Sequence, residues 1–201
     1  SATVQLVDVM KRWRAAVPGI EFYLLTNFPN WGYGDQPAYH SWQHTGQGSR
    51  GWGDYKVILE TALKATTNAG IPLKGVTVDN PLDYATGSFR SNQPTVTQGV
   101  DWIGRILALE KQVEEAKLEF SMIFNSSQAG AKDGGSDQAY QSDTLRYISL
   151  YRERGGEPRN VIVQSWYDRP SHCLPETEAT SMTGVVAEVI RQVKKPVADT
   201  P

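Results

Sequence analysis

Residues 54–80 read DYKVILETALKATTNAGIPLKGVTVDN, and the fold class of the chain can be predicted from them. Its first part places apolar side chains at helical spacing after Asp54, a residue type typical of helix N-caps, and the pattern ends at Gly70. Its second part, residues 75–79, is a short apolar run typical of a strand buried in a parallel sheet. A helix followed directly by such a strand is the repeating unit of α/β folds.

The same alternation continues on both sides of this stretch. Further helices are predicted at residues 6–17, 96–117, 137–154 and 182–193, and further strands at 22–26, 120–125 and 161–165. The strands are almost continuously apolar, which predicts that both faces of the sheet are buried. In the first helix one apolar stripe is predicted to pack inward, and it consists of Leu6, Val9, Met10, Trp13 and Val17.

A helix followed by four strand–helix units predicts an α/β domain with right-handed crossovers, for which two architectures remain open. Four strands cannot close a barrel of eight, and the first helix has no strand before it in the sequence. The favoured prediction is therefore a partial (half) (β/α)8 barrel, and a fragment of a larger barrel is one form that it can take. A partner chain or a missing N-terminal half would complete it. The alternative is an open doubly wound parallel sheet.

The 201 residues contain no linker rich in Pro, Gly or Ser, so a single domain covering residues 1–201 is predicted. The net charge is −2, and Lys and Arg are scattered, which argues against a nucleic-acid or membrane-surface partner. The single cysteine, Cys173, excludes an intrachain disulfide. No Gly-rich phosphate-binding pattern follows a predicted strand, and no cofactor is predicted.

The connections from strand to helix are long, at residues 27–53, 80–95, 126–136 and 166–180, whereas those from helix to strand are short. In parallel α/β folds, all strand-to-helix connections emerge at the carboxyl edge of the sheet, where binding sites are built. Long loops usually carry function, so the site is predicted at this edge.

The first long loop is rich in aromatic side chains, with Trp31, Trp42 and Trp52. Flat rings can stack on the apolar face of a sugar, which makes Trp31 and Trp42 candidates for substrate binding, or they can pack the loop onto the scaffold. His40 and His44 lie four residues apart, as metal ligands on a helix would, but Gly and Pro flank them. Hydrogen bonding to substrate is favoured, and a metal site formed with Asp79 is the alternative.

Asp79 ends the second predicted strand and is the leading catalytic candidate, because a buried carboxylate is costly unless it is paired or used. The alternative is that it binds loop amides before Pro81. Asn27 and Asn125 stand at the corresponding strand ends and are candidates for binding substrate hydroxyls. Asp83 is a weaker catalytic candidate and a more typical turn residue.

The segment after the fourth strand carries a second group of candidates. Gln164, Trp166 and His172 are predicted to bind substrate, and Asp168 and Glu176 to supply the second catalytic carboxylate. Two carboxylates about 5–9 Å apart suffice for glycoside hydrolysis. Alternatively, Glu176 and Glu178 interact with the dipole of the last helix. A thiol nucleophile at Cys173 is disfavoured, since His172 is its direct neighbour in sequence.

These residues give the chain a resemblance to the C-terminal half of a glycoside-hydrolase-type (β/α)8 barrel. The resemblance is carried by Asp79, by Asn27 and Asn125, and by Gln164-Ser165-Trp166 in the closing strand. A Trp after the last strand is similar to the sugar-platform Trp of many such barrels. The resemblance covers nearly the whole chain in architecture, but its motifs are short.

The resemblance implies a carbohydrate-active enzyme, in particular a glycoside hydrolase, that acts on an oligosaccharide or polysaccharide, with a secreted or periplasmic location favoured. Many retaining enzymes of this type end two strands in Glu, whereas no predicted strand here does. Either the acids are Asp residues, or one lies outside this chain, or the chain is not a hydrolase. The alternatives are a non-catalytic carbohydrate-binding module and a metal-dependent hydrolase.

Overall fold

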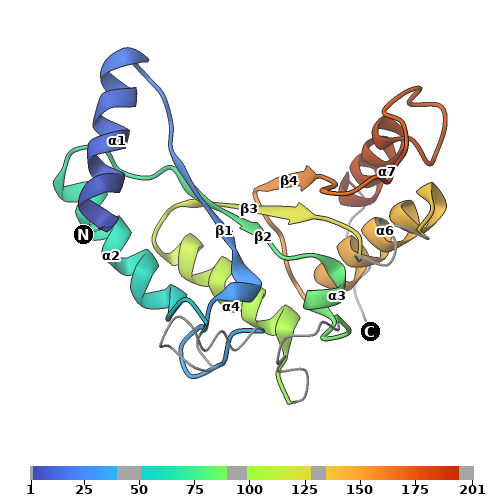
Figure 1. Cartoon of the computed structure of the whole chain (residues 1–201), viewed down its shortest axis with the longest axis horizontal. Helices are drawn as coiled ribbons and strands as arrows, with labels where there is room; N and C mark the ends of the chain where they lie inside the picture. The colour runs from blue at the N-terminus through green and yellow to red at the C-terminus, as the bar shows by residue number, and fades with distance from the viewer. Residues whose placement is uncertain (1, 40–50, 90–98, 128–134, 195–201) are drawn as a thin grey trace.

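The computed structural model describes residues 2–39, 51–89, 99–127 and 135–194 of the chain (Figure 1). The predicted alternation of helices and strands is confirmed. The described elements are α1 (Ala2–Ala16), β1 (Tyr23–Asn27), the 3-10 helix η1 (Phe28–Asn30), α2 (Tyr55–Asn68), β2 (Gly75–Asp79), α3 (Leu82–Ala85), α4 (Trp102–Glu115), β3 (Glu119–Phe124), α6 (Asp137–Glu153), β4 (Asn160–Val163) and α7 (Met182–Lys194).

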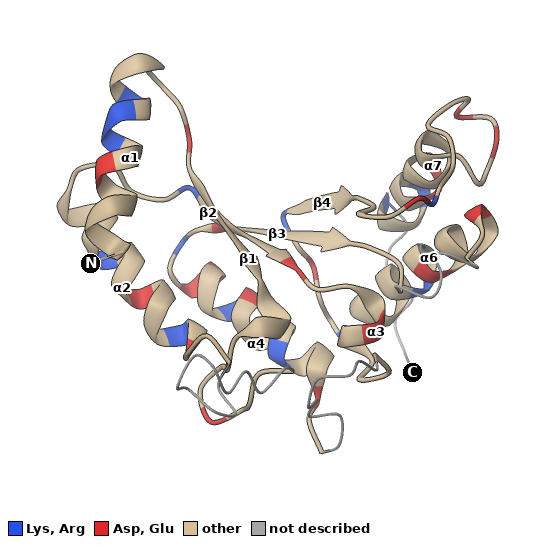
Figure 2. Ribbon diagram, viewed as in Figure 1, with Lys and Arg blue, Asp and Glu red and all other residues tan. Residues whose placement is uncertain are grey.

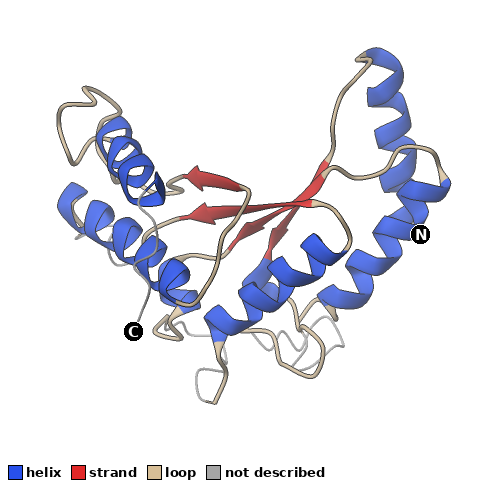
Figure 3. Cartoon of the chain, turned by 180° about the vertical axis from the view of Figure 1, so that it is seen from behind, coloured by secondary structure: helices blue, strands red, loops and turns tan. Residues whose placement is uncertain are grey.

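The strands form one parallel sheet in the order β1-β2-β3-β4, which confirms the α/β class (Figure 3). The register places Asp79 of β2 opposite Asn27 of β1 on one side and Ile123 of β3 on the other. At the other end of β2, Gly75 is opposite Tyr23 and Glu119. The carboxyl ends of all four strands therefore meet at one edge, as the sequence predicts.

The main core lies on one face of this sheet. Alternate side chains of β2 and β3 point to it, because successive residues in a strand face opposite sides. Helices α2, α4, α6 and α7 supply the other half of the core, and in Figures 1 and 3 they lie below and beside the sheet. The buried strand residues on this face are Val76, Val78, Phe120, Met122 and Phe124.

The opposite face of β1 is open, so the prediction that every strand is buried on both faces is wrong for this strand. It is also wrong for β4, whose four residues are all only half-buried. Leu25 is 60% exposed and Tyr23 is also exposed, whereas Thr26 between Leu25 and Asn27 is buried. Towards the middle of the same face, Ser121 and Ile123 are buried. The sheet is thus covered unevenly, and least at its β1 edge.

The apolar stripe predicted for the first helix is also only partly inward. Met10 is buried together with Ala62, Ile71 and Leu73, which fixes α1 beside α2. Val9, Trp13 and Val17 are exposed instead. The spacing of these residues predicts correctly that they share a face of the helix. It does not predict whether other described residues bury that face.

The start of the third predicted helix is wrong as well. Gly99 and Val100 are not helical, and α4 begins at Trp102 because the Asp101 carboxylate caps it by accepting from the Gly104 N–H at 3.0 Å. A Cβ at Gly104 would lie 2.3 Å from Asp101 Oδ2, so a larger residue here would displace the capping carboxylate. The fourth strand ends at Val163, two residues before its predicted end, and the short helices η1 and α3 were not predicted.

Charged residues of both signs are interspersed along the described ribbon (Figure 2). Within the described ranges, no helix combines the length and the apolar character needed to cross a membrane.

One buried carboxyl group makes the stability depend on pH. Glu110 of α4 accepts from the Tyr151 hydroxyl at 2.9 Å and from the Glu157 N–H at 3.1 Å, and burial raises its pKa from 4.5 to about 7. The folded state holds this proton more tightly than the unfolded state does. The free energy of unfolding therefore falls as the pH rises from about 4.5 to about 7, because the buried group must then ionise.

We expect Glu110→Gln to remove this dependence. The free energy of unfolding of the variant, measured relative to that of the parent, should therefore be about 1–3 kcal/mol higher at pH 8 than at pH 5. Urea unfolding of both proteins at the two pH values measures the difference. Glu115→Gln changes an exposed residue of the same helix and is the matched control. Its free energy of unfolding should change with pH as that of the parent protein does. An equal pH slope in Glu110→Gln and the parent would contradict the assignment.

Candidate functional site

The carboxyl end of β2 holds a buried carboxyl group, that of Asp79. The Asp79 side chain is buried, with 7% of the residue exposed, and its Oδ1 has no hydrogen-bond partner. Burial raises the pKa of Asp79, and a hydrogen bond from the Trp166 side chain partly lowers it. Asp79 therefore holds its proton more tightly than an ordinary aspartic acid does, and its unpaired Oδ1 is itself buried.

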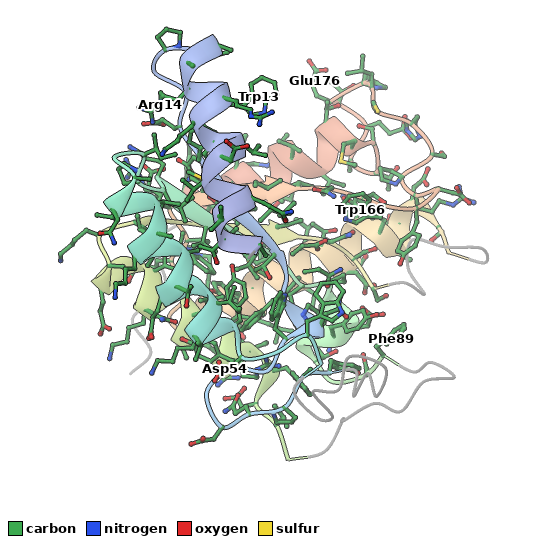
Figure 4. The ribbon with its side chains drawn as sticks, turned by 60° about the vertical axis from the view of Figure 1, so that its left-hand side comes forward. Trp13, Arg14, Asp54, Phe89, Trp166 and Glu176 are labelled. Carbon is green, nitrogen blue, oxygen red and sulfur yellow. The ribbon has the colours of Figure 1, made fainter. Side chains whose placement is uncertain are left out.

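Trp166 follows β4 and brings the segment after the fourth strand to the end of the second. The residue is 64% exposed although its side chain reaches Asp79, and Figure 4 shows it beside the sheet. The turn that carries it is fixed by Ser165, whose hydroxyl donates to the Arg169 carbonyl and accepts from the Tyr167 N–H at 3.3 Å. An exposed indole ring next to a buried carboxyl group is an arrangement suited to stacking a sugar ring over an acid.

Asn125 lies just beyond the end of β3 and is fully buried. Its carbonyl accepts from the Leu82 N–H at 3.2 Å, which holds α3 close to the strand end. Neither Oδ1 nor Nδ2 of its side chain has a hydrogen-bond partner. Buried amides normally have their hydrogen bonds satisfied, so Asn125 is an exception among the described residues, at the end of β3.

Asp83 on α3 lies near the same tyrosines as Asp79. The sequence indicated Asp83 only weakly as a catalytic candidate. Asp83 is buried, and burial together with the charges of Asp79 and Asp83 raises the pKa values of Tyr147 and Tyr167. The Tyr147 hydroxyl donates to the Asn80 carbonyl at 2.7 Å, which fixes the chain directly after β2. Asp83 follows Asp79 by four residues, with a proline between them. This short separation was the feature of the sequence that could have placed the two carboxyl groups near each other.

The other predicted partners of Asp79 are placed differently. Asn27 is exposed next to Asp79 in the register of the sheet, and Gln164 is half-buried, with its carbonyl accepting from the Tyr140 hydroxyl at 2.9 Å. Asp168 is exposed two residues after Trp166. Glu176 is exposed too, and Figure 4 shows it well away from Trp166. The structure therefore brings Asn27 and Trp166 to Asp79 but separates Glu176 from Trp166.

His172 is held in a network that fastens the segment after β4 to the start of α6. Its Nε2 lies 2.9 Å from Glu178 Oε1, and its Nδ1 lies 3.4 Å from Asp137 Oδ2. The Ser171 hydroxyl donates to the same Asp137 carboxylate at 2.6 Å. These contacts give His172 and Glu178 a positioning role for the segment that carries Trp166.

Trp31 packs within the loop after β1, as the packing alternative predicted. Its ring lies edge-on against Trp52 at 5.6 Å and Tyr55 at 5.5 Å between centroids. Its carbonyl accepts from the buried Arg105 guanidinium at 2.7 Å, and that group lies over the Phe28 ring. Trp31 thus holds the start of the loop on the scaffold.

His40, Trp42 and His44 lie outside the described residues, so their predicted roles in substrate or metal binding stay predictions. Among the residues that the structure describes, no three His, Cys, Asp or Glu side chains are grouped so that they could hold a metal ion.

Comparison of the chain with protein-family models, with curated proteins and with solved structures finds no match. The geometry at the carboxyl edge of the sheet is therefore the basis on which a function can be proposed.

Proposed function

We propose that the carboxyl edge of the sheet is a carbohydrate-processing site and that the chain acts as a glycoside hydrolase, with Asp79 as one of its two carboxylates. The observation that carries this proposal is the hydrogen bond between the buried Asp79 carboxyl group, whose Oδ1 has no partner in the described structure, and the largely exposed Trp166 side chain. A sugar stacked on Trp166 would place a glycosidic oxygen within reach of Asp79.

Each residue of this site has a distinct role. Asp79 acts as the general acid, because its raised pKa keeps it protonated at higher pH than an ordinary aspartic acid. Trp166 is the sugar platform, and Asn27, Asn125 and Gln164 bind hydroxyl groups. Asp168 and Glu176 remain the candidates for the second carboxylate, and the buried Asp83 joins them.

In this proposal the chain is a partial (β/α)8 barrel, and the site lies at the carboxyl edge of its strands. With right-handed crossovers, a strand order that never reverses puts every crossover helix on the same face of the sheet, as in a barrel. A doubly wound sheet has a reversal in strand order, which places helices on both faces. The order β1-β2-β3-β4 and the common core of α2, α4, α6 and α7 support the barrel arrangement.

A non-catalytic carbohydrate-binding module on the same scaffold is the second candidate. It is favoured by the exposure of Asp168 and Glu176, since neither is held in a buried environment beside Asp79. In this case Trp166 and the amides would bind the sugar, and no product would form. Incubation of the protein with a panel of nitrophenyl glycosides and oligosaccharides, followed by detection of released product, separates the two functions.

Two changes at Trp166 test its proposed roles separately. Trp166→Ala removes the platform, and we expect it to raise KM about tenfold, corresponding to about 1.4 kcal/mol of lost stacking. Trp166→Phe keeps a ring but removes the N–H that stabilises the Asp79 carboxylate. The pKa of Asp79 should therefore rise further, and the alkaline limb of the kcat/KM profile should move to higher pH.

Trp52→Phe is the control, because this exposed tryptophan packs against Trp31. It should change neither KM nor the pH profile. An alkaline limb that stays in place in Trp166→Phe would remove Asp79 from the role of acid.

A further inference from the structure

Among the described residues, the backbone of β1 is paired with a strand along one edge only. In the described sheet β1 has a strand neighbour only in β2. The Phe22 carbonyl accepts from the Lys74 N–H at 2.8 Å, on the β2 side. Successive residues of a parallel strand turn their backbone groups to opposite edges, so the N–H and C=O groups of Tyr23, Leu25 and Asn27 face the free edge.

Helix α1 presents an apolar stripe on the side away from α2. Val9, Trp13 and Val17 follow one another at intervals of four residues and are all exposed, with Trp13 at 55%. Figure 4 shows Trp13 projecting from α1 on the side opposite α2. Exposed large apolar residues that form a stripe, rather than standing singly, mark an interaction surface.

The position of α1 relates this stripe to the free edge. Each crossover helix in this architecture covers the seam between the strands that it connects, as α2 does for β1 and β2. Helix α1 lies next to α2 through Met10 and Ala62, and therefore beyond β1. The place beneath the stripe is where another strand would pair with β1.

We infer that the free edge of β1 and the Val9–Trp13–Val17 stripe form a docking site for a parallel β-strand, which is the last strand of a complementary strand–helix polypeptide. This inference rests on the partial barrel proposed above. The docked strand makes backbone hydrogen bonds with Tyr23, Leu25 and Asn27, and alternate apolar side chains of the strand pack beneath α1.

The occupant is a different polypeptide unit rather than a second copy of this chain. In a two-fold pairing of two copies, β4 of one would join β1 of the other. Helix α7 lies next to α6, which covers β3 and β4, so α7 lies beyond β4 in the way that α1 lies beyond β1. The α7 of the second copy and α1 would then compete for one seam. A partner that ends in a strand, with no helix after it, avoids this clash. In that case α1 alone covers the seam between the docked strand and β1.

The test uses the full chain and a synthetic peptide of seven alternating Val and Thr residues with a lysine at each end. At about 1 mM peptide we expect one-to-one binding, a blue shift of tryptophan fluorescence that is absent in Trp13→Ala, and slower hydrogen exchange at the Leu25 amide. Leu25→Pro removes the outward N–H without removing a hydrogen bond to β2, and it should abolish the binding.

Trp13→Ala should weaken peptide binding by about tenfold, whereas Val4→Ala, an exposed truncation outside the stripe, should leave it unchanged. The absence of exchange protection at Leu25, or equal binding by Leu25→Pro and the parent, would overturn the inference. So would sedimentation showing that the chain alone forms a dimer that Leu25→Pro dissociates. These measurements report on β1 and α1, whereas the activity assay reports on Asp79. A negative result for peptide docking is therefore distinguishable from a negative result for glycoside hydrolysis.

Discussion

Asp79→Asn is expected to lower kcat for a glycoside substrate by about 10²- to 10⁴-fold while substrate binding stays within about threefold. Asparagine has nearly the same shape but cannot donate an acidic proton to the leaving group. The burial of Asp79 makes the carboxyl group effective as an acid, because it raises the pKa of that group. Initial rates and equilibrium binding, measured on the same preparation, separate the two effects.

The matched control for this experiment is Asp8→Asn, the same chemical change at an exposed residue of α1 that pairs with Arg12. It should leave both kcat and binding as they are in the parent protein. Unchanged turnover in Asp79→Asn would remove this residue from the mechanism. Retained sugar binding without any turnover in the parent protein would instead favour the non-catalytic module.

The partner of Asp79 can be identified by the same measurement on three further variants. Asp83→Asn, Asp168→Asn and Glu176→Gln each remove one candidate carboxylate, and the true partner should show a loss of kcat comparable to that of Asp79→Asn. The burial of Asp83 and its position near Asp79 favour it on structural grounds. Equal activity of all three variants would place the second carboxylate elsewhere.

Phe124→Ala is expected to lower the free energy of unfolding by about 3–5 kcal/mol, more than any other variant proposed above. The Phe124 ring is buried and packs edge-on against Tyr147 and Tyr151, with centroids 5.1 and 5.7 Å away. It also lines a cavity of about 270 Å³, which the truncation would enlarge. Chemical denaturation of the parent and variant proteins measures the difference.

Leu25→Ala is the control for this second prediction, since it truncates a strand residue on the open face of the sheet. We expect it to change the free energy of unfolding by no more than about 0.5 kcal/mol, because Leu25 is exposed. A loss similar to that of Phe124→Ala would mean that the open face of β1 is covered in the isolated chain, and it would contradict the uneven burial of the sheet.

The sequence alone was sufficient for the order and type of the main elements. The stretch from Asp54 to Asp79 has a cap, a helical apolar pattern and a β-branched run, and all three are local features that survive in α2 and β2. The short α3 was not predicted, because its four residues do not form a periodic pattern and the bond from the Leu82 N–H to the Asn125 carbonyl fixes its start.

The candidate site was predicted in part. Asp79, Asn27 and Asn125 were found because strand ends in a parallel sheet must share one edge. The exposure of Glu176 and the fixing of His172 by Asp137 and Glu178 were not predictable, since the path of a long loop depends on contacts between distant residues.

The alternation of helices and strands follows from the residues alone, since periodicity is a local property, and polar strand ends in a parallel sheet must then meet at the carboxyl edge. Which apolar faces are buried depends on the tertiary packing, which leaves Leu25 and Trp13 exposed and buries Phe124. The tertiary packing also decides that Trp166 reaches Asp79. The physical reason is that burial and the pKa of a carboxyl group depend on neighbours that are far away in the chain.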